Sequence, residues 1–216
     1  AVVMSAVGPY ARAYFSATGH PAPAFWPLSL FLWAGLNALV VSADAFNTYV
    51  TLEIVSLVGV GLTALGRERA LAAAFRYLIA GMLASLLYLL GIAVLYVEHG
   101  TLVLSELAAL AATGESGFVA IPCIVLGLAL KAALFPLHFW LPAAHANAPA
   151  PVSAVLSALV VKAAFYLLAR WWLAGLTLEF TPGLMQILGV MGAAAVLWGS
   201  LQALLAPRVK LCVAYS

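Results

Sequence analysis

"LKAALFPLHFWLPAAHANAPAPVSAVLSALVVKAAFY", residues 130–166, is an apolar segment that nevertheless contains two lysines, Lys131 and Lys162. Two histidines, His138 and His145, lie between the lysines, together with prolines at positions 136, 142, 149 and 151. A charged side chain at the centre of a bilayer costs about 2.5–3.5 kcal/mol on insertion scales, so such residues are usually functional. The segment therefore predicts an interrupted membrane helix whose ionisable groups have a function.

The composition of the whole chain supports a membrane environment. The chain is 66% hydrophobic and only 7% charged, whereas soluble domains carry about 25% charged residues, so it cannot cover a water-facing surface. The net charge of +2 is not clustered, which gives no indication of nucleic-acid binding. Cys123 and Cys212 lie far apart in apolar runs without metal-ligand spacing. We therefore expect an integral membrane protein with no metal, no cofactor and no catalytic residue for covalent chemistry.

Helical spans are expected wherever about 20 apolar residues run together. The sequence predicts spans at roughly 24–43, 45–65, 71–97, 118–140, 150–173 and 183–206. Residues 1–15 are interpreted as the end of an earlier span and residues 208–216 as the start of a later one. The chain begins with Ala1 and has no basic n-region, so no signal peptide is expected. The pattern predicts an all-α, polytopic membrane helix bundle that is part of a longer protein.

The loops between successive spans are expected on alternate sides of the membrane. Assigned in this way, the charged residues outside the spans separate by sign. One face is predicted to hold the cations Arg12, Arg67, Arg69, Arg76, Arg208 and Lys210. The other is predicted to hold Asp44, Glu98, Glu106, Glu115, Glu179 and the single cation Arg170. The positive-inside rule assigns the first face to the cytoplasm. We therefore expect a multi-pass protein of a bacterial-type inner (cell) membrane with its Arg-rich loops in the cytoplasm.

Three ionisable residues are expected near the middle of the bilayer. Glu53 lies nine residues after Asp44, which is a candidate helix cap, and is therefore roughly 13 Å deep at 1.5 Å per residue. Lys131 is roughly 20 Å from the outer side, and Lys162 is roughly 18 Å from the inner side. The hydrocarbon layer is about 30 Å thick. These depths predict a polar row of mixed sign that lies parallel to the membrane plane.

The prolines indicate where the helix breaks. Pro136 and Pro142 have no N–H group, so in a helix the carbonyls of Ala132 and His138 would lose their partners. We expect a broken helix near Lys131–Pro142, with Lys131 and His138 two turns apart on one face. Water trapped at such a break would suit proton transfer. His138 is a candidate to exchange the proton, because histidine titrates near neutral pH.

Each candidate also has a purely structural interpretation. Glu53 and one of the lysines could form a pair that only holds helices together. Lys162 could extend past Tyr166 toward the outer interface, as long cationic side chains do near helix ends. His145 and Arg76 could be ordinary interfacial residues. His145, Arg76 and Tyr166 are therefore secondary candidates for proton transfer.

Residues 130–170, "LKAALFPLHFWLPAAHANAPAPVSAVLSALVVKAAFYLLAR", resemble the signature of the antiporter-like membrane subunits. These subunits occur in respiratory complex I, in membrane-bound hydrogenases and in Mrp-type cation/proton antiporters. The motifs that carry the resemblance are "FPLHFWLP", "AHANAP" and "PVSA", followed by a lysine in the next helix. "YVTLEIVSL", residues 49–57, resembles the glutamate-bearing helix of the family, and "VKLCVAYS", residues 209–216, resembles its Lys-x-x-x-Ala-Tyr-Ser element.

The resemblance implies roles for individual residues. Glu53 matches the glutamate of the family's fifth helix, and Lys131 matches the lysine beside the break in its seventh helix. Lys162 matches the lysine that passes protons toward the centre of the protein, and His138 matches the histidine of the break region. Some members carry a histidine before that second lysine, where this chain has Ser157, which implies a shorter or water-filled relay.

The resemblance also implies a domain organisation and a function. Residues 1–23 are expected to end an earlier span and form a cytoplasmic loop, residues 24–173 to form a first five-helix repeat, and residues 174–216 to begin a second, incomplete repeat. The function implied is that of a proton-translocating subunit of a larger membrane complex, with other membrane subunits as partners and Na⁺ as an open alternative ion. An inert structural subunit and a stand-alone cation or solute transporter remain alternatives. Membership of an ion-translocating oxidoreductase is left open.

Overall fold

The computed structural model describes residues 2–19, 22–66, 69–110, 117–173 and 181–215. All regular elements in these ranges are helical. In chain order they are α1 (Val2–Thr18), α2 (Phe25–Val41), α3 (Ala45–Ala64), α4 (Ala70–His99), α5 (Leu104–Leu110), α6 (Gly117–Lys131), α7 (Leu141–Asn147), α8 (Ala150–Val155), the π-helical turn η1 (Leu156–Val160), α9 (Val161–Leu173), α10 (Thr181–Leu205) and α11 (Val209–Tyr215).

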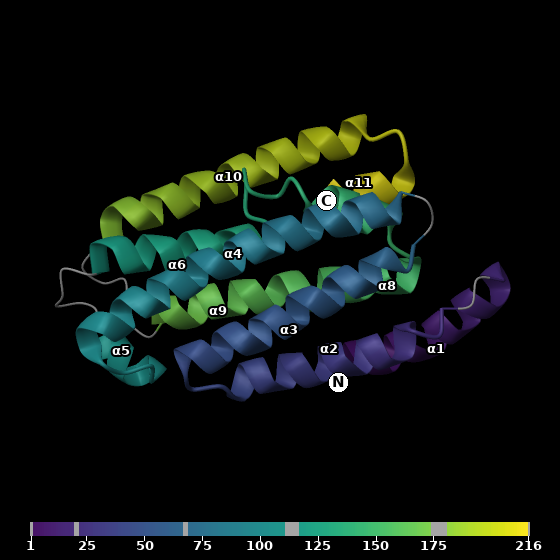
Figure 1. Ribbon diagram of the computed structural model, residues 1–216. Helices are drawn as coiled ribbons and strands as arrows, with labels where there is room; N and C mark the ends of the chain where they lie inside the picture. Colours follow the sequence, from purple (N-terminus) through teal and green to yellow (C-terminus); the bar gives the residue numbers. More distant parts are fainter. Residues whose placement is uncertain (1, 20–21, 67–68, 111–116, 174–180, 216) are drawn as a thin grey trace.

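The long helices from α2 to α9 pack side by side and run alternately up and down the bundle (Figure 1). Within the described ranges, four stretches are long and apolar enough to cross a membrane, namely Ala45–Ala64, Ala70–His99, Ala150–Leu173 and Gln186–Leu205. Two shorter apolar helices, Phe25–Val41 and Val119–Lys131, lie among them. Each span expected from the sequence thus corresponds to a helix, which confirms the predicted all-α bundle. The short helix α5 was not expected.

The two ends of the bundle carry different connections. The end of α3, the start of α4 and the start of α8 lie at one end, whereas α5 lies at the other (Figure 1). At the second end Asp44 accepts a hydrogen bond from the N–H of Asn47 at 2.8 Å, so it caps α3 as the sequence suggested. A short backbone bridge joins Asp44 to Val103. Arg67, Glu115 and Glu179, which contribute to the predicted orientation, lie outside the described residues.

Helices α4 and α6 pack closely because glycine removes side chains from their interface. A Cβ atom on Gly127 of α6 would lie 2.6 Å from the carbonyl oxygen of Ala84, and one on Gly91 of α4 would lie 2.7 Å from that of Ala120. Small residues allow membrane helices to approach in this way. The contact fixes α6 against α4 along its length, up to the point where α6 ends at Lys131.

Helix α6 ends through a backbone motif that does not involve proline. Ala133 has a left-handed backbone with φ of 54°. Its N–H donates to the carbonyl of Leu130 at 3.2 Å, and the N–H of Leu134 donates to that of Ala129 at 2.9 Å. This 5→2 and 6→1 pair of bonds is the Schellman motif, which closes many helices. The broken helix predicted near Lys131–Pro142 is therefore confirmed, but the break begins before the first proline of the segment.

The predicted role of the prolines at the break was wrong in detail. Pro136 lies in the non-helical segment 132–140, so it does not interrupt a continuous helix. Pro142 lies in the first turn of α7, where a missing N–H leaves no helical bond unmade. The carbonyl of His138 accepts a hydrogen bond from the N–H of Leu141 at 3.0 Å, so Pro142 does not leave it free. Because segment 132–140 is not helical, Lys131 and His138 do not share a helix face.

Candidate functional site

An ion pair with a buried lysine and a half-buried glutamate joins α6 to α3. The Nζ atom of Lys131, the last residue of α6, lies 2.9 Å from Oε2 of Glu53, near the middle of α3. The Lys131 side chain is 5% exposed and that of Glu53 is 21% exposed. Nζ also lies 3.5 Å from the carbonyl oxygen of Leu52, to which it donates. The structure thus brings together two of the mid-membrane residues predicted from the sequence.

A third helix contributes to the same site. The hydroxyl of Ser85, midway along α4, donates a hydrogen bond to Oε2 of Glu53, the oxygen that also pairs with Lys131. Ser85 is buried. Ser85 was not predicted from the sequence, because a lone serine in an apolar span does not indicate which helix it faces. The carboxylate of Glu53 is therefore held between α4 and α6, where Ser85 and Lys131 both donate hydrogen bonds to it.

A small cavity lies beside the ion pair. Its volume is about 10 Å³, and its lining includes Ser56, Tyr77, Lys131, Trp140 and Val160. That volume is near the lower limit for one water molecule. Ser56 and Tyr77 offer hydroxyl groups to it, whereas Val160 belongs to the π-helical turn that precedes α9. The cavity thus lies between Lys131 and the helical segment of Val160 and Ala164, and most of its lining is apolar.

Two aromatic residues fix the chain after the break. The rings of Tyr77 and Trp140 stack with centroids 4.4 Å apart and planes 10° apart. The indole N–H of Trp140 donates to the carbonyl of Leu130 at 3.0 Å, so it binds back to the end of α6. Gly59 leaves room for the Tyr77 hydroxyl, which would lie 2.6 Å from a Cβ atom at that position. Neither Tyr77 nor Trp140 was predicted to belong to the site.

Lys162 lies apart from the ion pair. Its Nζ donates to the carbonyl of Ser157 at 2.7 Å, toward the start of its own helix. The side chain therefore points away from Tyr166, which is one turn further along and 39% exposed. Lys162 lines an open groove of about 800 Å³ whose lining also includes His145 and Lys210. The interpretation in which Lys162 extends past Tyr166 does not match this geometry.

The remaining sequence candidates lie in different surroundings. His138 is half-buried in the break segment, and its ring stacks on Phe135 with centroids 5.5 Å apart. His145 is buried in α7, and its Nδ1 lies 2.9 Å from Oγ of Ser153, which does not fit an ordinary interfacial residue. Arg76 is exposed in the second turn of α4. Within the described residues no cluster of three or more metal-ligating side chains occurs.

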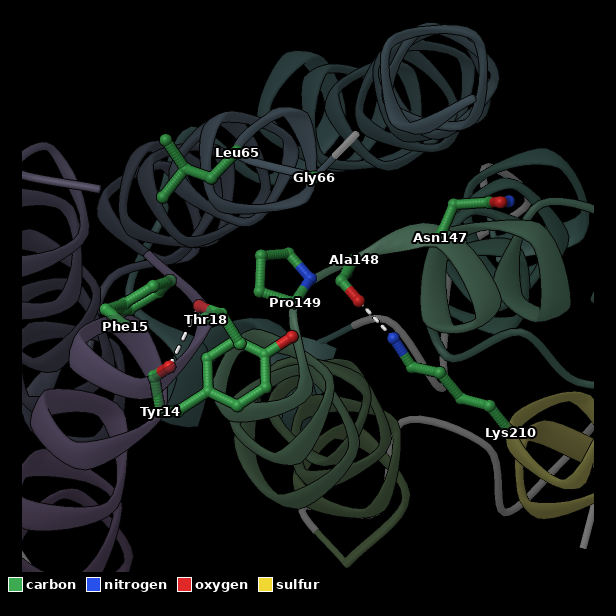
Figure 2. A pocket seen from close by; sticks show the side chains of 9 residues that line it. All are labelled: Tyr14, Phe15, Thr18, Leu65, Gly66, Asn147, Ala148, Pro149 and Lys210. Carbon is green, nitrogen blue, oxygen red and sulfur yellow. Dashed lines mark hydrogen bonds between the residues drawn. The ribbon is translucent and has the colours of Figure 1, made fainter. Parts of the chain in front are cut away.

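A second pocket opens at the end of the bundle that carries the connection between α7 and α8 (Figure 2). Its volume is about 410 Å³, and it is lined by Tyr14, Phe15, Thr18, Leu65, Gly66, Asn147, Ala148, Pro149 and Lys210. The amine of Lys210 points to the carbonyl of Ala148 and donates a hydrogen bond to it (Figure 2). Because Lys210 lines both this pocket and the groove of Lys162, it lies at the boundary between them.

Comparison with curated proteins gives a consistent set of relatives. The chain is 39% identical over 214 residues to NADH-quinone oxidoreductase subunit N of Desulforudis audaxviator, covering 97% of this chain and 42% of the relative. It is 32% identical over 187 residues to a Na⁺/H⁺ antiporter subunit of Alkalihalophilus pseudofirmus, covering 78% of this chain and 37% of the relative. The chain thus spans about two fifths of the length of these relatives.

Solved structures of similar fold come from membrane complexes. A chain of the Mrp complex from a Dietzia species matches with a TM-score of 0.85 and 28% identity, over 99% of this chain and 41% of that one. A chain of respiratory complex I from Thermus thermophilus matches with a TM-score of 0.70 and 33% identity, over 88% and 42%. Residues 42–216 match the transmembrane family described as NADH:quinone oxidoreductase/Mrp antiporter. The chain therefore belongs to this family of antiporter-like membrane subunits.

Proposed function

We propose that this chain is part of a proton-translocating, antiporter-like subunit of a larger membrane complex. The observation that carries the proposal is the Glu53–Lys131 ion pair, whose lysine is buried at the end of an interrupted helix. An isolated ion at this depth is costly, and a buried pair is itself weak evidence for stability. The role assigned to the pair is therefore functional: the buried amine of Lys131 takes up and releases a proton.

The pair controls the proton on Lys131 through its geometry. At 2.9 Å the carboxylate of Glu53 favours the ammonium form of Lys131. When the two groups separate, that support is lost and the proton leaves. Ala164 of α9 lines the small cavity beside Lys131, and we place the release of the proton on this side, toward Lys162. Lys131 is the last residue of its helix, where a change in the break segment moves the amine.

His138, His145, Arg76 and Tyr166 have secondary roles in this proposal. His145 and Lys162 line the same groove, which is the proposed route for a proton between them. His138 and Tyr166 are placed in this proposal on either side of the proton path from Lys131 to Lys162. Arg76, which is exposed near the start of α4, serves as an interfacial anchor.

The wider organisation is part of the same proposal. Residues 24–173 form the first five-helix repeat, residues 174–216 begin a second, and residues 1–23 precede both. The boundary between the repeats lies at residues that the structure does not describe. The end of the bundle where α3 ends and α4 begins faces the cytoplasm of a bacterial-type cell membrane. Other membrane subunits supply the energy, and the transported ion is the proton, with Na⁺ as the competing candidate.

Transport by the complete protein in its complex tests this proposal. The complex carrying Lys131→Ala is reconstituted in sealed vesicles, and proton transport is followed with a pH-sensitive dye. Loss of the carrier amine is expected to lower transport by roughly a hundredfold, a size typical for a proton-transfer group. Glu106→Gln, at an exposed carboxylate of α5 far from the pair, is the control and retains normal transport.

The same assay separates the rival functions. An inert structural subunit would leave transport intact in Lys131→Ala vesicles that contain a normally assembled complex. A stand-alone transporter would move ions when the complete protein is reconstituted without partner subunits. Either result would overturn the proposed function.

A further inference from the structure

The Ser85 hydroxyl makes an unusual contact for a serine inside an apolar helix. Such a serine commonly bonds to the carbonyl of its own helix four residues earlier. Thr63 of α3 does so, with its hydroxyl 2.8 Å from the carbonyl oxygen of Gly59. Ser85 instead donates across the helix interface to Glu53. The residue is 3% exposed, so water does not readily replace it as a donor to the carboxylate.

The two partners of Glu53 differ in how firmly they are held. Ser85 lies in the middle of α4, a helix of 30 residues that packs closely on α6 through Gly91 and Gly127. Its hydroxyl is attached to the backbone through a single carbon. Lys131 has a four-carbon side chain and lies two residues before the left-handed turn at Ala133. When the ion pair opens, the lysine is therefore the partner that has freedom to move.

We propose that Ser85 is a positioning residue that holds the Glu53 carboxylate in place, as an anion, while Lys131 separates from it and returns. A hydrogen bond to a charged acceptor is stronger than one between neutral groups. The bond from Ser85 thus stabilises the carboxylate during the interval in which the lysine is absent. Without it, the anion would be left in an apolar bundle with less compensation, and each opening of the pair would be harder. This inference rests on the proposed function and deepens it.

Variants of Ser85 in the complete protein, assembled in its complex, test the inference. Ser85→Ala removes the donor and is expected to lower proton transport in sealed vesicles roughly tenfold, in line with a hydrogen bond to a charged group. Ser85→Thr keeps the hydroxyl and is expected to retain most of the transport. Ser29→Ala is the matched control, because Ser29 is a buried serine of α2 whose hydroxyl finds no hydrogen-bond partner among the described residues. The amount of assembled complex is measured for every variant.

A second background separates positioning from a general structural role. In a Glu53→Gln background, Ser85→Ala is expected to cause little further loss, because the carboxylate that Ser85 serves is already gone. An equal further loss in that background would overturn the inference, as would normal transport by Ser85→Ala. If Ser85→Thr fails to assemble, the comparison in the Glu53→Gln background still distinguishes a positioning role from a structural one. Failure of the proposed function is a distinct result, namely retained transport by Lys131→Ala.

Discussion

The ion pair between Glu53 and Lys131 sets the residue-scale chemistry of the molecule. Taking two charges out of water is expensive, and removing one partner leaves the other buried without compensation. The surviving group then escapes this cost by changing its protonation state. A pair of this kind can couple the presence or absence of one charge to the proton on the other. Ser85 adds a neutral donor to the same carboxylate oxygen.

Lys162 provides a prediction at this scale. Its amine is exposed and bonds to a carbonyl of its own helix, so Lys162→Gln is expected to leave assembly nearly unchanged. Transport is expected to fall roughly a hundredfold, the size typical for a proton-transfer group. Vesicle transport and the yield of assembled complex are the two measurements. Normal transport with full assembly would remove Lys162 from the pathway.

The sequence predicted the charged members of the site but missed the neutral ones. Glu53 and Lys131 were recognisable because a charge in an apolar run needs an explanation. Ser85, Tyr77 and Trp140 carry no charge and are tolerated in membrane helices without a special role. Their importance depends on which helix lies opposite, and periodicity alone does not indicate that. Long-range packing therefore determined the part of the site that could not be predicted.

At the scale of elements, the end of α6 is the decisive feature. The sequence predicted a break near the correct position from the prolines, yet the helix is closed at Ala133 by a left-handed residue. Alanine gives little sign of this conformation, because glycine is the residue that usually adopts it. The actual position of the break places Lys131 in the last turn of the helix. Its amine therefore lies beside the irregular segment.

A substitution at Ala133 tests the origin of the break. Ala133→Gly removes the steric cost of a left-handed backbone and is expected to raise the free energy of unfolding by about 1 kcal/mol. The measurement is thermal or denaturant unfolding of the purified protein in detergent. Ala132→Gly is the control, because Ala132 does not have a positive φ, and the change is expected to lower stability slightly. A loss of stability in Ala133→Gly would contradict the assigned motif.

At the scale of the whole molecule, the bundle has two distinct ends. Arg69 lies beside the start of α4 at one end, and Glu106 lies in α5 at the other (Figure 1). Large apolar side chains such as Leu71, Phe75 and Ile79 are exposed along the outside of α4, as expected where a helix faces lipid or a partner helix. The arrangement fits a bundle that is inserted across a membrane.

The orientation of the bundle is open to direct measurement. Single cysteines at Arg69 and Glu106, in a chain whose Cys123 and Cys212 are replaced, are expected to react from opposite sides of the membrane. Arg69→Cys should react only with a reagent that reaches the cytoplasmic side, in line with the positive-inside rule. Both positions are exposed, so failure to react is not expected. Labelling of the two positions from the same side would contradict the topology.

Coupling between Glu53 and Lys131 is the central claim, and proton pumping by the intact complex in sealed vesicles tests it most directly. Glu53→Gln, Lys131→Ala and the double variant are compared at equal amounts of assembled complex. Both single variants are expected to reduce pumping, with the larger loss in Lys131→Ala. The double variant is expected to be no worse than Lys131→Ala alone, because groups that act as a unit are not additive. Independent losses that multiply in the double variant would show that the two charges do not work together.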